Sequence, residues 1–213
     1  TAGETTGARA LAARQGVFFV VSLILLLVLG RFHYSVYRSL TGPAYVLGLI
    51  LLIVPLIQAH PIRGAEAWIV FGGARIQPAE FMKVALILVL ARILSGNSGR
   101  SLSARRLGAS LLAFGVPAFF ILKQPDLGTA VLLAGTAVGM LLIGGLTRAQ
   151  KLLLLGGGVL FAILAWSFLL EGYQKERLLV FLHPERDALG SGYTVLQART
   201  AFGSGGLVGR GLG

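Results

Sequence analysis

The sequence predicts an all-α, polytopic membrane protein, and composition is the first reason. Of its 213 residues, 55% are hydrophobic and only 13% are charged, whereas a soluble domain has roughly 25% charged residues. The charges gather between long apolar runs, and the mean hydropathy is +0.82. The chain has no Cys, which excludes thiol nucleophiles, thiolate metal sites and disulfides. We therefore expect a single membrane domain over residues 1–213.

The apolar runs are the second reason, because about six of them are long enough, or nearly so, for the roughly 20-residue helix that crosses a bilayer. They are residues 16–32, 43–59, 81–94, 107–122, 127–146 and 152–170. The third is short and carries Lys83 and Arg92 near its ends, so neighbouring helices must shield it or its charges must reach the interface. Pro55 and Pro117 lie inside spans, where we expect kinks and compensating bonds from other helices.

The loops between the spans predict the orientation. On one side of the predicted bilayer they carry basic residues and no acid: Arg31, Arg38, Arg92, Arg100, Arg105, Arg106, Arg148 and Lys151. The positive-inside rule makes that side cytoplasmic, and it places residues 1–15, 60–80, 123–127 and 171–213 on the outer side. The net charge of +11 then reflects cytoplasmic loops and anionic lipid, so we expect no nucleic-acid partner.

Common soluble catalytic patterns are missing from the sequence. The Gly-rich run at the end is not a P-loop, because Leu212 stands where that motif has Lys. The three His residues lie in different loops, which excludes metal-ligand spacing among them, and no G-x-S-x-G elbow occurs. The chain begins without Met and stops in the same Gly-rich run, so we expect a piece of a longer protein.

Two segments on the predicted outer side offer chemistry near the third span. Residues 60–77 are too polar and Gly-rich to cross the membrane and hold Trp68, which suits an interfacial aromatic belt. In the Gln77 to Lys83 segment, Pro starts a helix, and Glu80 and Lys83 are three residues apart and so share a face. Ionisable groups are costly in a membrane, so this pair either neutralises itself or builds a site.

Two further outer segments follow. Asp126 precedes the fifth span and is a natural N-cap for it, a structural role that competes with a functional one. The tail from residue 172 onward is amphipathic over 174–182 and fits either a helix lying on the membrane surface or a lid. Its arginines, among them Arg177, suit an anionic group such as a diphosphate, which guanidinium groups bind through two parallel hydrogen bonds.

Taken together, four stretches resemble the SEDS family, specifically its RodA branch: GAEAW, IQPAEFMKVALILVLARIL, KQPDLGTAVLLAGTAVGMLLIGGL and YQKERLLVFLHPERDALGSGYTVLQARTAFGSGGLVGRGLG. The resemblance implies a ten-helix membrane fold, of which this chain supplies the second to seventh helices and part of an outer loop. It also implies a peptidoglycan glycosyltransferase that polymerises lipid II on the outer face of the bacterial cytoplasmic membrane, for cell-wall elongation and cell shape. The implied partner is a class B penicillin-binding protein.

The resemblance also implies which residues line the substrate cavity. Those that match family positions are Trp68, Glu80, Lys83, Asp126, Arg177 and Gln197. Ala67 stands where the family usually has Arg, and the family's candidate catalytic Asp lies beyond residue 213, so no catalytic residue is assigned within this chain. A divalent cation could share the binding of the diphosphate. The alternatives are a lipid II flippase or transporter, for which inverted repeats would be expected, and a structural scaffold.

Overall fold

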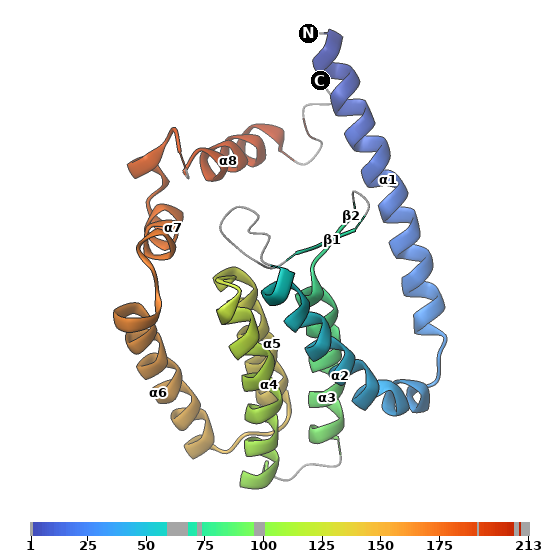
Figure 1. The fold of residues 1–213 in the computed structure, drawn as a ribbon, viewed down its shortest axis with the longest axis vertical. Helices are drawn as coiled ribbons and strands as arrows, with labels where there is room; N and C mark the ends of the chain where they lie inside the picture. The colour runs from blue at the N-terminus through green and yellow to red at the C-terminus, as the bar shows by residue number, and fades with distance from the viewer. Residues whose placement is uncertain are drawn as a thin grey trace. The chain divides into compact units, whose positions relative to one another are not determined.

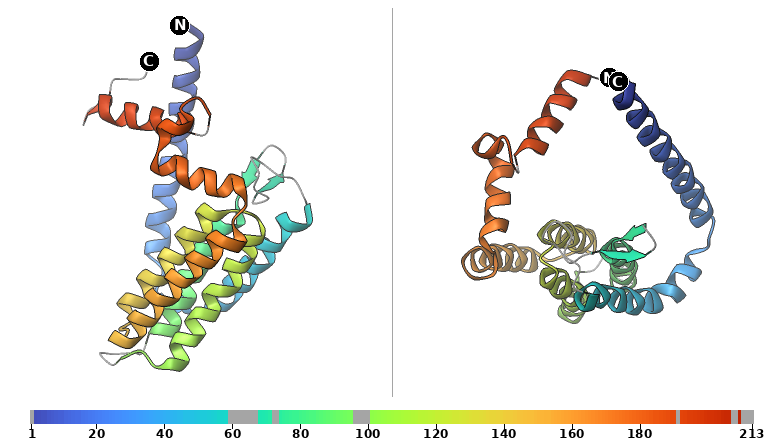
Figure 2. Two further views of the ribbon diagram at one scale, coloured as in Figure 1. Left: turned by 90° about the vertical axis from the view of Figure 1, so that its left-hand side faces the viewer. Right: turned by 45° about the horizontal axis from the view of Figure 1, so that its top comes forward.

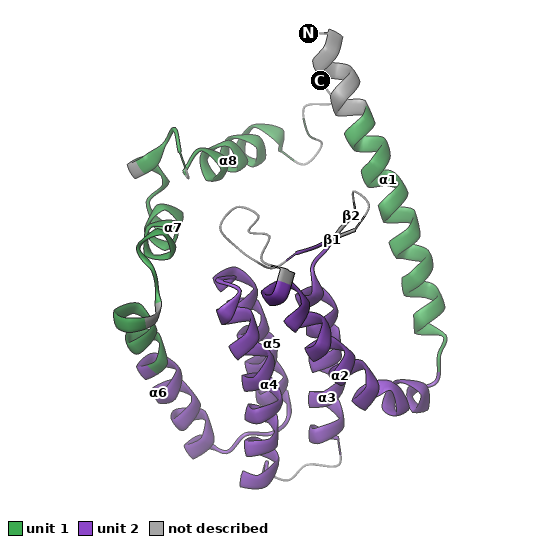
Figure 3. Cartoon of the chain, in the orientation of Figure 1, with its two compact units in different colours: residues 1–32, 161–213 green, residues 33–160 purple. Residues whose placement is uncertain are grey.

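The computed structural model describes residues 2–58, 68–71, 74–95, 101–190, 192–206 and 209, mostly as helices (Figure 1). Ala67, Arg100 and the 60–67 part of the outer segment lie outside these residues. The chain divides into two compact units (Figure 3): residues 33–160 form one, and residues 1–32 with 161–213 form the other. The predicted all-α class is confirmed, with one short β-hairpin as the exception.

The unit of residues 33–160 is a bundle of helices. Its elements are α2 (Tyr34–Gln58), the antiparallel strands β1 (Ile69–Phe71) and β2 (Ala74–Ile76), α3 (Pro78–Leu94), α4 (Ala104–Lys123), α5 (Leu127–Ile143) and most of α6 (Arg148–Leu164). Helices α2 to α5 run alongside one another in both views (Figure 2), and α3 packs against α2, α4 and α5.

The short, charged α3 is the helix that the others shield. One face of it is buried, with Met82, Leu86 and Leu90 fully inaccessible to solvent. These side chains pack against Leu52 of α2 and Leu133 of α5 in the main hydrophobic core. Burying large aliphatic side chains contributes roughly 1.5–3 kcal/mol each. The bundle therefore holds in place a helix that the sequence makes unsuited to lipid.

A polar side chain compensates for the proline within α4. Pro117 has no N–H, so the carbonyl of Ala113, one turn earlier in α4, loses its normal donor. The Tyr45 hydroxyl of α2 donates to that carbonyl at 2.8 Å. This bond between helices confirms the compensation predicted from the sequence at Pro117. Near Pro55 in α2, the Gln124 side chain donates to the carbonyl of Leu52 at 2.6 Å, which is not the carbonyl that Pro55 frees.

A smaller core joins the end of α3 and the end of α5 to the starts of α4 and α6. It is formed by Leu102, Leu107, Leu141 and Leu146, with Leu94 and Leu154 against it. The connecting loops are tied together, because Leu102 N–H donates to the Gly145 carbonyl at 3.0 Å and the Gln150 amide donates to the Leu102 carbonyl at 2.7 Å. Gly145 has a φ of 87°, a conformation that glycine adopts without strain.

The second unit begins with α1 (Ala2–Gly30) and continues after α6 with a π-helical turn (Ala165–Leu169), α7 (Gly172–Leu182), a 3-10 turn (Pro184–Asp187) and α8 (Tyr193–Gly205). The Lys175 ammonium lies 5.9 Å from the centre of the Trp166 ring. At Gly192, a Cβ atom would collide with the backbone carbonyl of Pro184. The turn that leads into α8 therefore requires glycine at this position.

Four helices are long and apolar enough to cross a membrane by length and composition: Ala10–Gly30, Tyr34–Ile57, Ala104–Lys123 and Arg148–Phe168. Helix α5 is apolar but shorter, at 17 residues. The helices contain the apolar stretches found in the sequence but differ at their ends. Helix α2 begins at Tyr34, so Pro43 lies inside a helix and not at its start.

Candidate functional site

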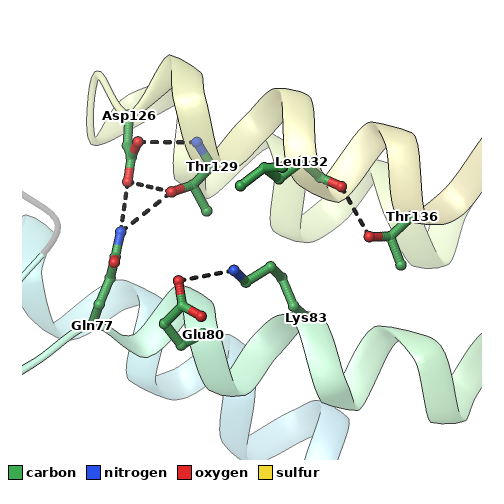
Figure 4. Close-up of polar contacts among 7 residues, drawn as sticks. All are labelled: Gln77, Glu80, Lys83, Asp126, Thr129, Leu132 and Thr136. Carbon is green, nitrogen blue, oxygen red and sulfur yellow. Dashed lines mark hydrogen bonds and ion pairs between the residues drawn. The ribbon is translucent and has the colours of Figure 1, made fainter. Parts of the chain in front are cut away.

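The start of α3 positions the first pair of candidate residues. Gln77 is extended, with φ −99° and ψ 109°, and Pro78 follows it as the first helical residue, because the residue before a proline disfavours the helical region. Glu80 falls in the first turn, where the positive end of the helix dipole stabilises a carboxylate. Lys83 Nζ donates to Glu80 Oε1 at 2.8 Å (Figure 4). The predicted shared face of Glu80 and Lys83 is thus confirmed.

The two members of this pair differ in their surroundings. The Lys83 side chain is 22% exposed and that of Glu80 is 61% exposed. Figure 4 shows both side chains on the side of α3 that faces α5. An ammonium group has three donors, and the bond to Glu80 uses one of them. Lys83 therefore has donors left for an anionic group placed between these helices.

Asp126 joins the start of α5 to the start of α3. Its Oδ1 accepts from the Thr129 N–H at 3.1 Å, which confirms the predicted N-cap. Its Oδ2 accepts from the Thr129 hydroxyl at 2.7 Å and from Gln77 Nε2 at 2.8 Å (Figure 4). Gln77 Nε2 also lies 3.3 Å from the Thr129 hydroxyl oxygen. Asp126 is therefore more than a cap, because it fixes the residue that precedes α3.

Gln124 completes this arrangement from the other side of the same turn. Its side chain is fully buried and donates to the Leu52 carbonyl of α2, and among the described residues its Oε1 has no partner. Gln124 and Asp126 thus connect the end of α4 with α2, α3 and α5. The sequence alone did not suggest a role for Gln77 or Gln124. Their positions could have done so, because each directly precedes a proline at a helix boundary.

Charges of both signs lie at this end of the bundle. We call it the Asp126 end, defined by Gln77, Glu80, Lys83, Gln124 and Asp126. The Lys83 ammonium pairs with Glu80, and Lys123, at the end of α4, has its Nζ 5.8 Å from the centre of the Phe119 ring. The described residues contain no group of three or more His, Asp or Glu that could hold a metal ion. Both oxygens of Asp126 accept hydrogen bonds, and Glu80 Oε1 accepts from Lys83.

The remaining candidates each have their own local surroundings. Trp68 is half-buried and directly precedes β1, in the same unit as Glu80. Arg177 belongs to the other unit, where it lines an open hollow of about 370 Å³ with Val180, Phe181, Thr194 and Val195. Its guanidinium carbon is 5.8 Å from the centre of the Tyr173 ring. Gln197 donates to the Tyr193 hydroxyl at 2.6 Å.

Comparison with known proteins identifies the family. The sequence model of the FtsW/RodA/SpoVE family, described as cell cycle protein, matches residues 1–213. The chain belongs to this family. The SEDS family that the motifs indicated is thereby confirmed, and the RodA branch is represented among its similar proteins. With its apolar helices, this SEDS chain is a multi-pass membrane protein.

Individual relatives match nearly the whole chain. It is 34% identical to FtsW of Idiomarina loihiensis over 203 residues, which are 95% of this chain and 49% of that protein. It is 32% identical to MrdB of Escherichia coli K12, named a peptidoglycan glycosyltransferase, over 195 residues, 90% of this chain and 51% of that one. The chain thus spans about half the length of the curated relatives it matches.

Two solved structures share the fold. A chain of a peptidoglycan synthase complex, described as coordinating polymerization and crosslinking, is 33% identical with a TM-score of 0.73, covering 93% of this chain and 58% of that chain. RodA of Thermus thermophilus is 30% identical with a TM-score of 0.58, covering 70% of this chain and 49% of that chain. The predicted origin of this chain in a larger SEDS fold agrees with these coverages.

Proposed function

We propose that this chain is part of a peptidoglycan glycosyltransferase that polymerises lipid II into glycan strands for cell-wall elongation. The observation that carries the proposal is the structure of the Asp126 end. The Glu80–Lys83 ion pair lies there on α3, the helix unsuited to lipid. Beside it, the hydrogen bonds among Asp126, Gln77 and Thr129 join α5 to the start of α3. The printed names of the relatives support the same reaction class.

In the proposed reaction, a hydroxyl of one lipid-linked sugar attacks the anomeric carbon of another. The new C–O bond forms as the bond to the undecaprenyl diphosphate breaks, and the diphosphate leaves with the electron pair. Lys83 holds the developing negative charge through its remaining donors, a kind of contribution worth roughly 10²–10³ in rate. From the family resemblance, we assign Arg177, Gln197 and Trp68 to substrate binding as well.

Glu80 is the binding partner of Lys83 in this scheme and not the base. Glu80 already accepts from Lys83 at 2.8 Å, and the family resemblance assigns the base that takes the hydroxyl proton to an Asp beyond residue 213. Asp126 serves to position α3 through Gln77. Any divalent cation would assist only with the diphosphate, and no step above depends on one.

We also propose how the bundle is oriented in the membrane. The Asp126 end faces the outside of the bacterial cytoplasmic membrane, and the opposite end of the bundle, rich in Arg, faces the cytoplasm. Residues 1–15, 60–80, 123–127 and 171–213 are outer. The partner is a class B penicillin-binding protein. Cysteine introduced at Ser103 should resist a membrane-impermeant reagent in intact cells, whereas cysteine at Thr194 should react, and the reverse pattern would contradict this orientation.

The test uses the full-length protein in liposomes with its partner and labelled lipid II. Lys83→Ala should lower the polymerisation rate by about 10²-fold or more, and Glu80→Gln should lower it less. The matched control is Glu185→Gln with Arg199→Ala, which removes a different ion pair, 3.7 Å apart and about 70% exposed. Unchanged glycan formation by Lys83→Ala would overturn the proposal. Transbilayer movement of lipid II without polymerisation would favour the transporter alternative.

A further inference from the structure

The end of the bundle opposite Asp126 carries cations without carboxylates. We call it the Arg92 end. Its basic residues are Arg38, Arg92, Arg105, Arg106, Arg148 and Lys151. The sequence has no Asp or Glu between Glu80 and Asp126, nor between Asp126 and Glu171. Within residues 33–58, which form α2 and its entry, acids are also lacking. No carboxylate of these helices is therefore available to neutralise the cluster.

Contacts within the unit bring these residues to one place. The core of Leu102, Leu107, Leu141 and Leu146 joins the end of α3 and the end of α5 to the starts of α4 and α6. Arg92 Nη1, in the last turn of α3, donates to the Arg38 carbonyl of α2 at 3.4 Å. All these basic side chains except Arg106, which is half-buried, are exposed. The cations thus lie at the same end of the bundle, and most of them are accessible.

The length of α3 places Arg92 at the depth of lipid phosphates. Its 17 residues span about 25 Å at 1.5 Å per residue, less than the hydrocarbon thickness of about 30 Å. The helices around it, α2 and α4, are long enough to cross. If the Asp126 end of α3 reaches one interface, Arg92 ends near or just inside the other. There its guanidinium needs an anion.

The backbone at this end adds to the positive potential. Helices α4 and α6 begin here, with Arg105 and Arg106 in the first turn of one and Arg148 at the start of the other. A cation is unfavourable at the positive end of a helix dipole, so an anion bound among these residues would relieve two repulsions at once. The Ser103 side chain caps one N–H of α4, and its hydroxyl carries no charge to offset the cluster.

We propose that the Arg92 end binds the headgroups of anionic phospholipids, with Arg38 and Arg92 as its centre. The positive charge of this end and the depth of Arg92 in the bilayer both favour phospholipid headgroups as the ligand. Phosphate groups are the anions that a bilayer supplies at the ends of membrane-spanning helices, and guanidinium groups bind phosphate through paired hydrogen bonds. The site goes beyond the proposed glycosyltransferase function and does not depend on it, because it involves the opposite end of the bundle.

The test measures lipid binding by the purified full-length protein in neutral detergent, by native mass spectrometry, with phosphatidylglycerol or phosphatidylcholine of the same acyl chains. We expect tighter binding of phosphatidylglycerol, weakened by salt. Because a basic residue near an anionic surface contributes about fivefold in affinity, Arg38→Gln with Arg92→Gln should weaken it about 25-fold. The control, Lys123→Gln with Lys175→Gln, removes two charges elsewhere and should leave binding unchanged.

A second variant shows whether a loss of binding by the first could be due to misfolding. Arg105→Gln with Arg106→Gln changes a different helix and should also weaken phosphatidylglycerol binding severalfold. Equal binding of the two lipids, or equal losses in the control, would overturn the proposal. Displacement of the lipid by soluble polyphosphate at equal phosphate concentration would overturn it too, because it would indicate a soluble polyanionic partner. Glycan polymerisation does not enter the readout, so failure here leaves the proposed function untouched.

Discussion

The two ends of the helical bundle use polar residues in opposite ways. At the Asp126 end, side chains of both signs bond to each other and to backbone groups of neighbouring helices. At the Arg92 end, the cations have no carboxylate on the same end of their helices and are mostly exposed. The polar groups of the first end are therefore held by bonds within the bundle, as a preformed site requires. The cations of the second end depend on anions outside the protein.

The largest expected effect concerns Gln124, at the organised end. Gln124→Glu removes the donor to the Leu52 carbonyl and leaves a carboxylate in a fully buried position, which should cost about 3 kcal/mol or more. Gln124→Leu should cost less, because it also removes the unpaired Oε1. Denaturant unfolding of the full-length protein in mixed micelles measures both. If Gln124→Leu were as stable as the unmodified protein, the buried bond would not be a determinant of this end.

Asp126 should show the next effect in size. Asp126→Ala removes the cap of α5 and the bonds to Thr129 and Gln77, and we expect a loss of about 1–2 kcal/mol. Asp126→Asn keeps the capping oxygen and should cost less than half as much. A double-mutant cycle with Gln77→Ala measures the tie between α3 and α5. An Asp126→Asn protein that is stable yet inactive in polymerisation would assign Asp126 a chemical role and contradict a purely positioning one.

Tyr45, at the contact between α2 and α4, offers a test with a smaller expected effect. Tyr45→Phe removes the donor to the carbonyl that Pro117 frees, with an expected loss of about 1 kcal/mol. In a Pro117→Ala background the helix can supply its own N–H to that carbonyl, so the same change should cost much less. The non-additivity is the observable. Additive losses would mean that the hydroxyl does not compensate for the proline.

The smallest effect is expected at the Arg92 end. In neutral lipid, Arg148→Gln should change the stability by no more than about 0.5 kcal/mol, as is usual for exposed surface substitutions. The same unfolding assay checks it. A loss comparable to that of Asp126→Ala would erase the contrast between the two ends, because it would show that Arg148 has a partner within the protein.

Much of the architecture could be predicted from the sequence, and the exceptions have physical causes. Apolar length predicted the helices, and the spacing of Glu80 and Lys83 predicted that they share a helix face. The role of Asp126 as a cap followed from its place before an apolar run. Its bond to Gln77 could not be predicted, because the two residues are 49 positions apart and meet only after α3 and α5 pack. The apolar stretch of residues 43–59 likewise did not show that α2 begins at Tyr34, because residues 34–42 are more polar.

The most direct test of the contrast between the ends is photo-crosslinking of the full-length protein in liposomes. The probe is a polyprenyl diphosphate sugar with a diazirine beside the diphosphate, and peptide mass spectrometry locates the adducts. We expect adducts in peptides that contain Glu80 and Lys83, and a marked loss of these adducts in Lys83→Ala. Adducts concentrated in peptides that contain Arg92, Arg105 or Arg106, unchanged by Lys83→Ala, would contradict it.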